Sequence, residues 1–134
     1  MDADRVWEAA QATVSGALPF PEIIGRLMAD GVESYQVDFA ARCFRFYSAA
    51  GGVAVAALTL PDLPAVAPDW DAPALRAAIL DSQQQGQKFA VFCQRAVAAG
   101  VLNYAVYLRG QRVVYSGRLG DQHTEWFPGA APAA

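Results

Sequence analysis

Residues 20–37 read FPEIIGRLMADGVESYQV, and residues 89–106 read FAVFCQRAVAAGVLNYAV. Seven of these eighteen positions are identical at a constant offset of 69 residues. Both stretches place apolar residues at helical spacing, follow them with a glycine, and continue as Val-x-x-Tyr-x-Val, which alternates as a strand does. An internal repeat of this kind indicates two copies of one supersecondary unit, so it decides the fold before any other feature of the chain.

The repeated pattern extends over one helix and three strands in each copy. After the first stretch, alternating apolar residues predict a strand around Phe44 and another over residues 53–58. The same two strands recur after the second stretch. We therefore predict two αβββ repeats, at about residues 20–58 and 89–127, related by a pseudo-twofold axis. The predicted fold class is α+β, a mainly antiparallel sheet with the helices packed against it.

The residues outside the two copies predict two more helices. Residues 3–14 carry apolar side chains at helical spacing. Residues 60–86 begin with prolines that favour an extended connector, and Asp71 then suits the N-cap of a helix. The chain has 134 residues, the length of one domain, so we predict a single domain over residues 1–134.

Three glycines are predicted to shape turns. Gly31 and Gly100 each end an apolar helix and precede a strand, so we expect a positive φ at both. Gly110 lies in the hairpin after the strand that contains Tyr104, where a positive φ again favours glycine.

The composition limits the classes of partner. Apolar residues make up 54% of the chain and charged residues 17%, which is typical of a folded globular protein. The formal net charge is −3 and the ten basic residues are scattered, so we expect no nucleic-acid binding. We also expect no membrane association and a cytoplasmic location, because the sequence has neither a long apolar run nor a signal peptide at its acidic start.

Cysteine and histidine usage argues against a metal site. Cys43 falls in a predicted strand and Cys93 on the apolar face of a predicted helix, and we interpret both as small buried hydrophobic residues. The chain has one histidine, whereas a zinc site needs three or four ligands. The sequence also lacks a phosphate-binding glycine loop and a nucleophilic-serine motif, so we predict no cofactor.

The third strands of the two copies differ most. Residues 53–58 read VAVAAL, whereas residues 122–127 read QHTEWF. His123 and Glu125 share one strand face, so they could act as a base and the group that orients it, or as two metal ligands, and they are close enough to contact one small molecule. Arg118, in the turn before the strand, could bind an anionic group. The alternative interpretation is the polar face of an exposed edge strand, with Trp126 turned to the core.

Two further sets of residues are expected to be structural. Asp38 and Arg45 lie on neighbouring predicted strands and could form a cross-strand ion pair. Three of the five tyrosines, Tyr35, Tyr104 and Tyr115, fall at core-facing positions, so we predict packing for them rather than a stacking surface for bases.

Several segments are shared with a known group of proteins. They are FPEII at 20–24, GVESYQVD at 31–38, QQG at 84–86, VYSGR at 114–118 and GDQHTEWFP at 120–128. With these segments the chain resembles, over about residues 18–128, a small bacterial family of unknown function whose members are often described as phage envelope proteins and occur in prophages. The chain departs from that family at Gln36, where many members have histidine. The resemblance implies a phage-related protein.

Three functional hypotheses follow from the sequence. The first is a non-enzymatic binding or interaction module, whose partner would be a small molecule or a protein, a second copy of the chain included. The second is a small hydrolase or ligand-binding enzyme that uses His123 and Glu125. The third is a structural component of a virion, which would assemble through large apolar interfaces. The sequence leaves open whether the protein is an enzyme.

Overall fold

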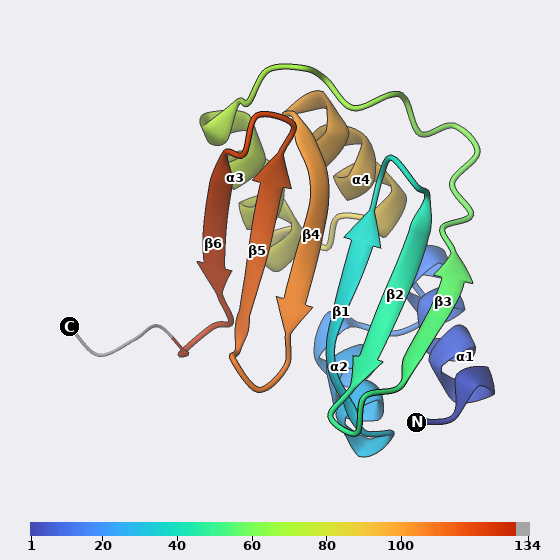
Figure 1. The fold of residues 1–134 in the computed structure, drawn as a ribbon. Coiled ribbons are helices and arrows are strands. Elements are labelled where there is room, and N and C mark those ends of the chain that lie inside the picture. Colours follow the sequence, from blue (N-terminus) through green and yellow to red (C-terminus); the bar gives the residue numbers. More distant parts are fainter. Residues whose placement is uncertain (131–134) are drawn as a thin grey trace.

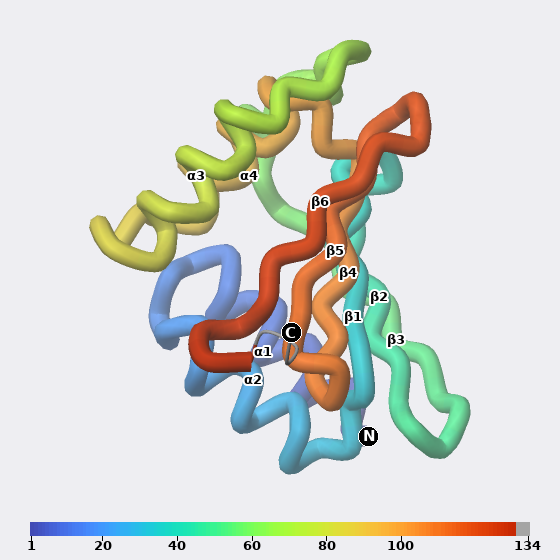
Figure 2. Tube along the Cα trace, turned by 90° about the vertical axis from the view of Figure 1, so that its left-hand side faces the viewer, coloured from blue at the N-terminus to red at the C-terminus, as the bar shows by residue number. Residues whose placement is uncertain are grey.

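A single six-stranded antiparallel sheet carries all four helices on one of its faces, as the computed structural model shows for residues 1–130 (Figures 1 and 2). This arrangement confirms the α+β class. Residues 131–134, the end of the predicted single domain, lie outside the described residues. The elements in chain order are α1 (Ala3–Ser15), α2 (Phe20–Ala29), β1 (Val32–Asp38), β2 (Cys43–Ser48), β3 (Val53–Ala57), α3 (Ala72–Gln84), α4 (Phe89–Ala98), β4 (Val101–Tyr107), β5 (Arg112–Gly117) and β6 (Gln122–Trp126).

The strand order places the first strand of one repeat beside the first strand of the other. Across the sheet the order is β3-β2-β1-β4-β5-β6, and every neighbouring pair is antiparallel. The elements from α2 to β3 begin at residues 20, 32, 43 and 53, and those from α4 to β6 begin at 89, 101, 112 and 122. Each interval is 69 residues. The two units therefore have the same element order, and they meet at β1 and β4.

Capping residues define the helix ends. The Asp2 carboxylate accepts hydrogen bonds from the N–H groups of Asp4 and Arg5 at the start of α1. The Asp71 carboxylate accepts one from the Ala74 N–H at 3.1 Å, which confirms the predicted start of α3. Side-chain oxygens at these positions satisfy backbone donors that the first turn leaves free.

The glycines that end the two repeated helices have positive φ, as predicted: 82° at Gly31 and 91° at Gly100. The prediction for Gly110 is wrong. The positive-φ residues of the two equivalent hairpins are Arg42, at 57°, and Gln111, at 53°. The last residue of these longer loops takes the left-handed conformation just before the returning strand, and side chains tolerate that region at modest cost.

The core lies between the helices and one face of the sheet. It is lined by large side chains that alternate along the strands, such as Val37, Phe44 and Phe46, each at most 2% exposed. Tyr35, Tyr104 and Tyr115 are also buried there, which confirms their core-facing positions. No helix formed by residues 1–130 covers the other sheet face (Figure 2). We call these the inner face and the open face.

The connector between β3 and α3 is held against both units. The Arg42 guanidinium donates to the carbonyl groups of Leu60, at 3.3 Å, and Leu63, at 2.6 Å. Further along, the Ala67 N–H donates to the Val97 carbonyl at 2.9 Å. Within residues 1–130, none of the helices has the length and apolar character needed to cross a membrane.

Candidate functional site

His123 and Glu125 form a hydrogen-bonded pair on β6, the edge strand of the second unit. The His123 Nε2 atom lies 3.1 Å from Glu125 Oε1. Their side chains are 23% and 34% exposed, so the pair is neither buried nor fully solvated. In the β5–β6 register His123 lies opposite Tyr115, and Glu125 lies opposite Val113.

That register places the pair on the inner face. Tyr115 and Val113 are buried beneath the helices, and residues directly opposite each other share a sheet face. The alternative interpretation is therefore wrong in turning Trp126 to the core. Trp126 lies opposite Arg112 on the open face, where the guanidinium carbon sits 3.9 Å from its ring centroid.

Tyr115 borders the pair from the interior, and Cys93 lies near Tyr115. The Tyr115 ring centroid is 6.3 Å from that of His123. Burial raises the pKa of Tyr115, and the negative charge of Glu125 raises it further. Cys93, on α4, is 0% exposed, and burial raises the pKa of its thiol. Both groups are therefore protonated and neutral at physiological pH. We call Cys93, Tyr115, His123 and Glu125 the inner-face cluster.

The Tyr115 hydroxyl is a free donor next to the pair. Within residues 1–130, every side-chain nitrogen or oxygen that is sealed from solvent has a hydrogen-bond partner. The Tyr115 hydroxyl makes no hydrogen bond to those residues, so it retains access to solvent although most of the ring is buried. The inner-face cluster thus combines a phenol beside an imidazole and a carboxylate, and the imidazole and carboxylate side chains are partly exposed.

The first unit has apolar residues at all four counterpart positions. Subtracting 69 from the numbers of the inner-face cluster gives Ile24, Phe46, Ala54 and Ala56. The same helix and strands form without the polar groups, so the scaffold does not require them. Ala56, the counterpart of Glu125, is buried in the first unit, so both units turn this position to the inner face.

Arg118 binds the connector. It lies exposed in the turn between β5 and β6, and its Nη1 atom donates to the Val66 carbonyl at 3.3 Å. Among the described residues, no hydrogen bond or ion pair joins Arg118 to His123 or Glu125. The structure brings together two of the three predicted site residues and gives the third a different partner.

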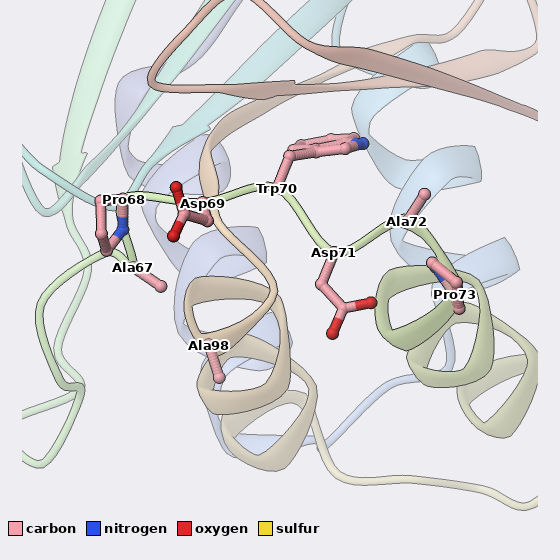
Figure 3. A pocket seen from close by; sticks show the side chains of 8 residues that line it. All are labelled: Ala67, Pro68, Asp69, Trp70, Asp71, Ala72, Pro73 and Ala98. Carbon is pink, nitrogen blue, oxygen red and sulfur yellow. The ribbon is translucent and has the colours of Figure 1, made fainter.

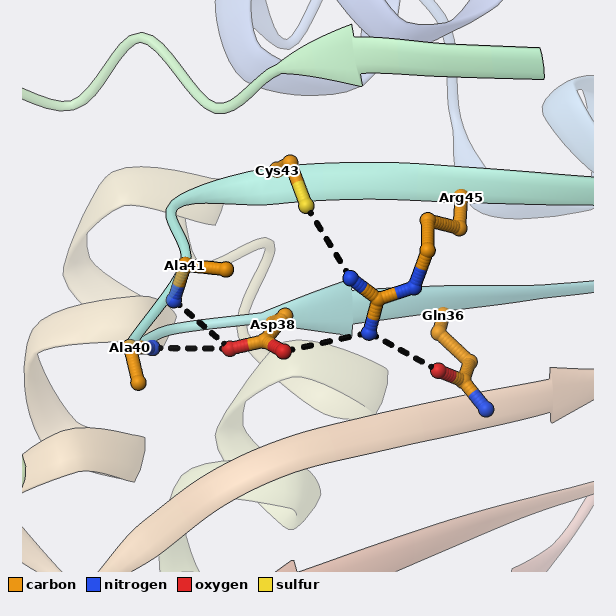
Figure 4. A network of polar contacts seen from close by, with 6 residues as sticks. All are labelled: Gln36, Asp38, Ala40, Ala41, Cys43 and Arg45. Carbon is orange, nitrogen blue, oxygen red and sulfur yellow. Dashed lines mark hydrogen bonds and ion pairs between the residues drawn. The ribbon is translucent and has the colours of Figure 1, made fainter.

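A second polar cluster occupies the open face of the first unit (Figure 4). The Arg45 guanidinium on β2 donates to Gln36 Oε1 and to Asp38 Oδ2, both at 3.1 Å, and lies 3.3 Å from the Cys43 sulfur. This geometry confirms the predicted Asp38–Arg45 ion pair. Cys43 is only partly buried, so the interpretation of both cysteines as buried residues holds for Cys93 alone.

Asp38 also organises the turn that follows β1. Its Oδ1 atom accepts hydrogen bonds from the N–H groups of Ala40, at 2.9 Å, and Ala41, at 2.8 Å. Burial opposes ionisation of Asp38, but the Ala41, Arg45 and Ala40 hydrogen bonds together outweigh it and lower the pKa of the carboxyl group. Each group in this open-face network has a partner within the network, which identifies it as a structural support of the turn.

An open depression of about 590 Å³ lies beside the connector where it enters α3 (Figure 3). Its acidic groups are Asp69 and Asp71, and Asp71 is engaged as the cap of α3. The Trp70 ring points away from Asp71 and toward the sheet, where it packs against Gly117. Across residues 1–130, no three histidine, cysteine or acidic side chains lie close enough to hold a metal ion.

Comparison with known protein families matches residues 8–122 with DUF1398, described as a protein of unknown function. The matched segment includes Arg118 and ends immediately before His123. A comparison with curated protein sequences gives no match. The family match covers well over half of the chain and extends from α1 to the first residue of β6. The chain therefore belongs to the DUF1398 family.

Proposed function

We propose that this protein is a non-enzymatic binding module that holds a small polar ligand at the inner-face cluster. The observation that carries the proposal is the difference between the two units. Four positions that are apolar in the first unit carry a thiol, a phenol, an imidazole and a carboxylate in the second. Because the same scaffold forms with apolar residues in the first unit and polar residues in the second, folding does not require the polar residues, and they are available to bind a ligand.

The chemistry of the cluster defines the ligand class. Glu125 supplies a carboxylate acceptor, the Tyr115 hydroxyl supplies a donor, and His123 can donate or accept. A ligand that bears hydroxyl or amine groups would donate to Glu125 and accept from Tyr115. An anionic ligand would be repelled by the negative charge of Glu125. Arg118 does not offset that charge, because its guanidinium is bound to the connector.

The electrostatics favour binding over catalysis. Burial raises the pKa of Tyr115 and of Cys93, which keeps both groups protonated. A buried neutral thiol is a poor nucleophile, and a neutral phenol is a hydrogen-bond donor rather than a base. The groups around His123 are thus suited to recognising a ligand.

One observation favours a hydrolase as the second candidate. The 3.1 Å contact between His123 Nε2 and Glu125 Oε1 is the geometry in which a carboxylate orients an imidazole that acts as a general base. This candidate predicts turnover that depends on His123 and falls when Glu125 is replaced. The binding module predicts a stable complex from which the ligand can be recovered unchanged.

His123 allows a direct test because it is the only histidine. Its ring signals in an NMR spectrum of the labelled protein need no further assignment. We expect them to shift on titration with millimolar ethanolamine, glycerol or an uncharged amino-acid amide, and to stay unchanged with acetate or inorganic phosphate. Ligand-observed saturation transfer should be lost in His123→Ala/Glu125→Ala.

The matched control lies on the same strand. Gln122 and Thr124 alternate with the pair and point to the open face, so Gln122→Ala/Thr124→Ala should bind as the wild-type protein does. Absence of any response across the neutral and amine probes would count against the proposal. An equal loss of binding in both double variants would show that the ligand does not contact the inner-face cluster.

A further inference from the structure

β3 is an uncharged edge strand with a free row of backbone groups. Its sequence is VAVAA, and within residues 1–130 it pairs with β2 alone. The Ser48 N–H donates to the Gly52 carbonyl, and the Leu58 N–H donates to the Arg42 carbonyl. In an antiparallel ladder hydrogen-bonded residues alternate, so the even-numbered residues bond to β2. The N–H and C=O groups of Val53, Val55 and Ala57 therefore point away from the sheet.

The two edges of the sheet differ in their protection against strand pairing. Proteins usually protect an edge with charged side chains or with a covering group. β6 carries Glu125 and places Trp126 under the Arg112 guanidinium. β3 has no charged side chain, and Val53 and Val55 are 58% and 66% exposed.

A large exposed aromatic side chain lies at the same edge. Trp7 on α1 is 54% exposed. Val6 and Ala10 face the core, and Arg5 and Ala9 line a groove between α1 and α2. Each helical residue advances by about 100°, so Trp7 lies on the flank of α1 opposite to α2.

The direction of that flank follows from the layers. α1 contacts β3 and α2 contacts β1, so the direction from α2 to α1 is also the direction from β1 to β3. The flank that carries Trp7 therefore faces outward past β3, and Figure 1 shows α1 on that side of the molecule. An unprotected strand and an exposed tryptophan thus share one edge.

We propose that β3 pairs antiparallel with β3 of a second copy of this chain. A twofold axis at Val55 would place Val55 opposite Val55 of the second copy, and Val53 opposite Ala57. In that register the outward N–H and C=O groups of both strands are hydrogen-bonded, and no like charges meet. The strand is self-complementary, as a twofold interface requires, and the two copies would join by the same kind of antiparallel pairing that joins β1 and β4 within the chain.

Trp7 supplies the apolar part of this interface. Tryptophan is among the residues that contribute most to binding at protein interfaces. The contact consists of one five-residue strand and one aromatic side chain per copy, which is small beside the roughly 1,200 Å² or more of a stable complex. We therefore expect a reversible dimer that forms at tens to hundreds of micromolar protein (about 10–500 μM).

Proline substitution can block pairing at the outer edge of β3 without removing the hydrogen bonds within the sheet. In Val55→Pro the lost N–H is an outward one, so the ladder with β2 keeps its hydrogen bonds while strand addition is blocked. The matched control is Thr124→Pro. Thr124 is the counterpart of Val55 on β6, and its N–H also points outward, because Gly117 and Phe127 show that odd-numbered residues of β6 bond to β5.

The measurement is sedimentation velocity from 10 μM to 1 mM protein, on the order of the range expected for so small an interface. We expect wild type and Thr124→Pro to shift from monomer to dimer, Val55→Pro to stay monomeric, and Trp7→Ala to dimerise at least tenfold more weakly. Hydrogen exchange on the wild type is the second measurement. The Val53, Val55 and Ala57 amides should gain protection as concentration rises, whether or not the variants fold.

Three results would overturn the proposal. The first is a wild-type protein that stays monomeric at every concentration. In that case β3 could pair only with an extended segment of a different protein. The second is a dimer that persists in Val55→Pro with no concentration-dependent protection at the β3 amides. The third is open-ended assembly that Thr124→Pro abolishes, because that result indicates pairing of β3 with β6 of the next copy.

Discussion

Gln36 lies directly opposite Ala105 across the β1–β4 pair, and the two residues are also 69 positions apart in the chain. Each residue is thus paired with its own counterpart. The flanking pairs are Ser34–Tyr107 and Asp38–Asn103. Replacing each residue of one pair by its counterpart 69 positions away gives the other pair. The register is that of a local twofold axis between Gln36 and Ala105. Many substitutions can therefore be compared with an equivalent one in the same molecule.

The glycines after the two repeated helices provide the first comparison. Both have positive φ, but a Cβ on Gly100 would lie 2.3 Å from the Asp69 carbonyl oxygen, whereas a Cβ on Gly31 would meet nothing within 4 Å. We predict that Gly31→Ala lowers the free energy of unfolding by about 1 kcal/mol through backbone strain alone. Gly100→Ala should lower it by about 3 kcal/mol or more, because the connector must also move.

Chemical denaturation of the two variants under the same conditions measures this difference. Equal losses of unfolding free energy in the two variants would show that the connector at Asp69 moves aside without destabilising the fold. A loss that is larger for Gly31→Ala would contradict the assignment of the close approach.

The open-face network predicts a dependence of stability on pH. Its hydrogen bonds hold the pKa of Asp38 below the ordinary value of 3.8. A group whose pKa is lower in the folded state stabilises the fold above its unfolded pKa and loses that contribution as pH falls through the folded value. The contribution of Asp38 is therefore complete at neutral pH and is lost in acid below about pH 4.

Asp38→Asn should remove this pH dependence and cost about 1 kcal/mol at neutral pH, since asparagine keeps the turn acceptor but loses the charge that faces Arg45. The measurement is urea denaturation between about pH 2.5 and 7, spanning the ordinary carboxyl range. Glu33→Gln is the control, because the Glu33–Arg109 pair is 3.7 Å long and well exposed. A control variant that changes the acid profile as much as Asp38→Asn does would contradict the prediction.

The two cysteines should react with thiol reagents at very different rates. Cys93 is fully buried, and burial raises the pKa of its thiol, whereas Cys43 is partly exposed. Since the thiolate is the reactive form, we predict one fast-reacting thiol in the folded protein and two after denaturation. Absorbance after addition of an aromatic disulfide reagent gives both numbers. Cys43→Ser should abolish the fast phase, and a fast phase that survives in this variant would place a reactive thiol at Cys93.

Replacing the pair on β6 should leave the fold intact. His123→Ala/Glu125→Ala gives the second unit the same residues that the first has at Ala54 and Ala56, so we predict a change in unfolding free energy within about 1 kcal/mol. Tyr115→Phe likewise copies Phe46 and should be close to neutral. Thermal and urea denaturation check both. A loss well above about 2 kcal/mol for the double variant would assign the pair to sheet stability instead of ligand binding.

The regular parts of the fold could be predicted because single residues specify them. Gly31 and Gly100 follow two helices at points where the backbone takes a positive φ. The Asp71 side chain supplies the oxygen that caps the start of α3. The alternation of Tyr35 and Val37 with polar neighbours identified the buried side of β1. These are local properties, and each depends on a few consecutive residues.

The parts that the sequence did not predict depend on pairing between distant residues. Alternation shows that His123 and Glu125 share a face, but in the segment 122–127 each face carries two polar residues and one aromatic residue, so only the register with Tyr115 shows which face is buried. The hairpin loop likewise decides that Gln111, and not Gly110, takes the left-handed conformation. The link between Arg118 and Val66 depends on the path of a connector that has no periodic pattern.

The strand order has a consequence for how the chain folds. In the described part of the chain, four of the five strand pairs join sequence neighbours, and only β1–β4 joins strands that are far apart. Closing the segment between Asp38 and Val101 costs about 3–4 kcal/mol of chain entropy, whereas each hairpin closes a loop of a few residues. We therefore expect each three-stranded unit to form early and the central pair to form last. The rate of folding should then depend on the length of the connector, while the rate at which each hairpin forms should not.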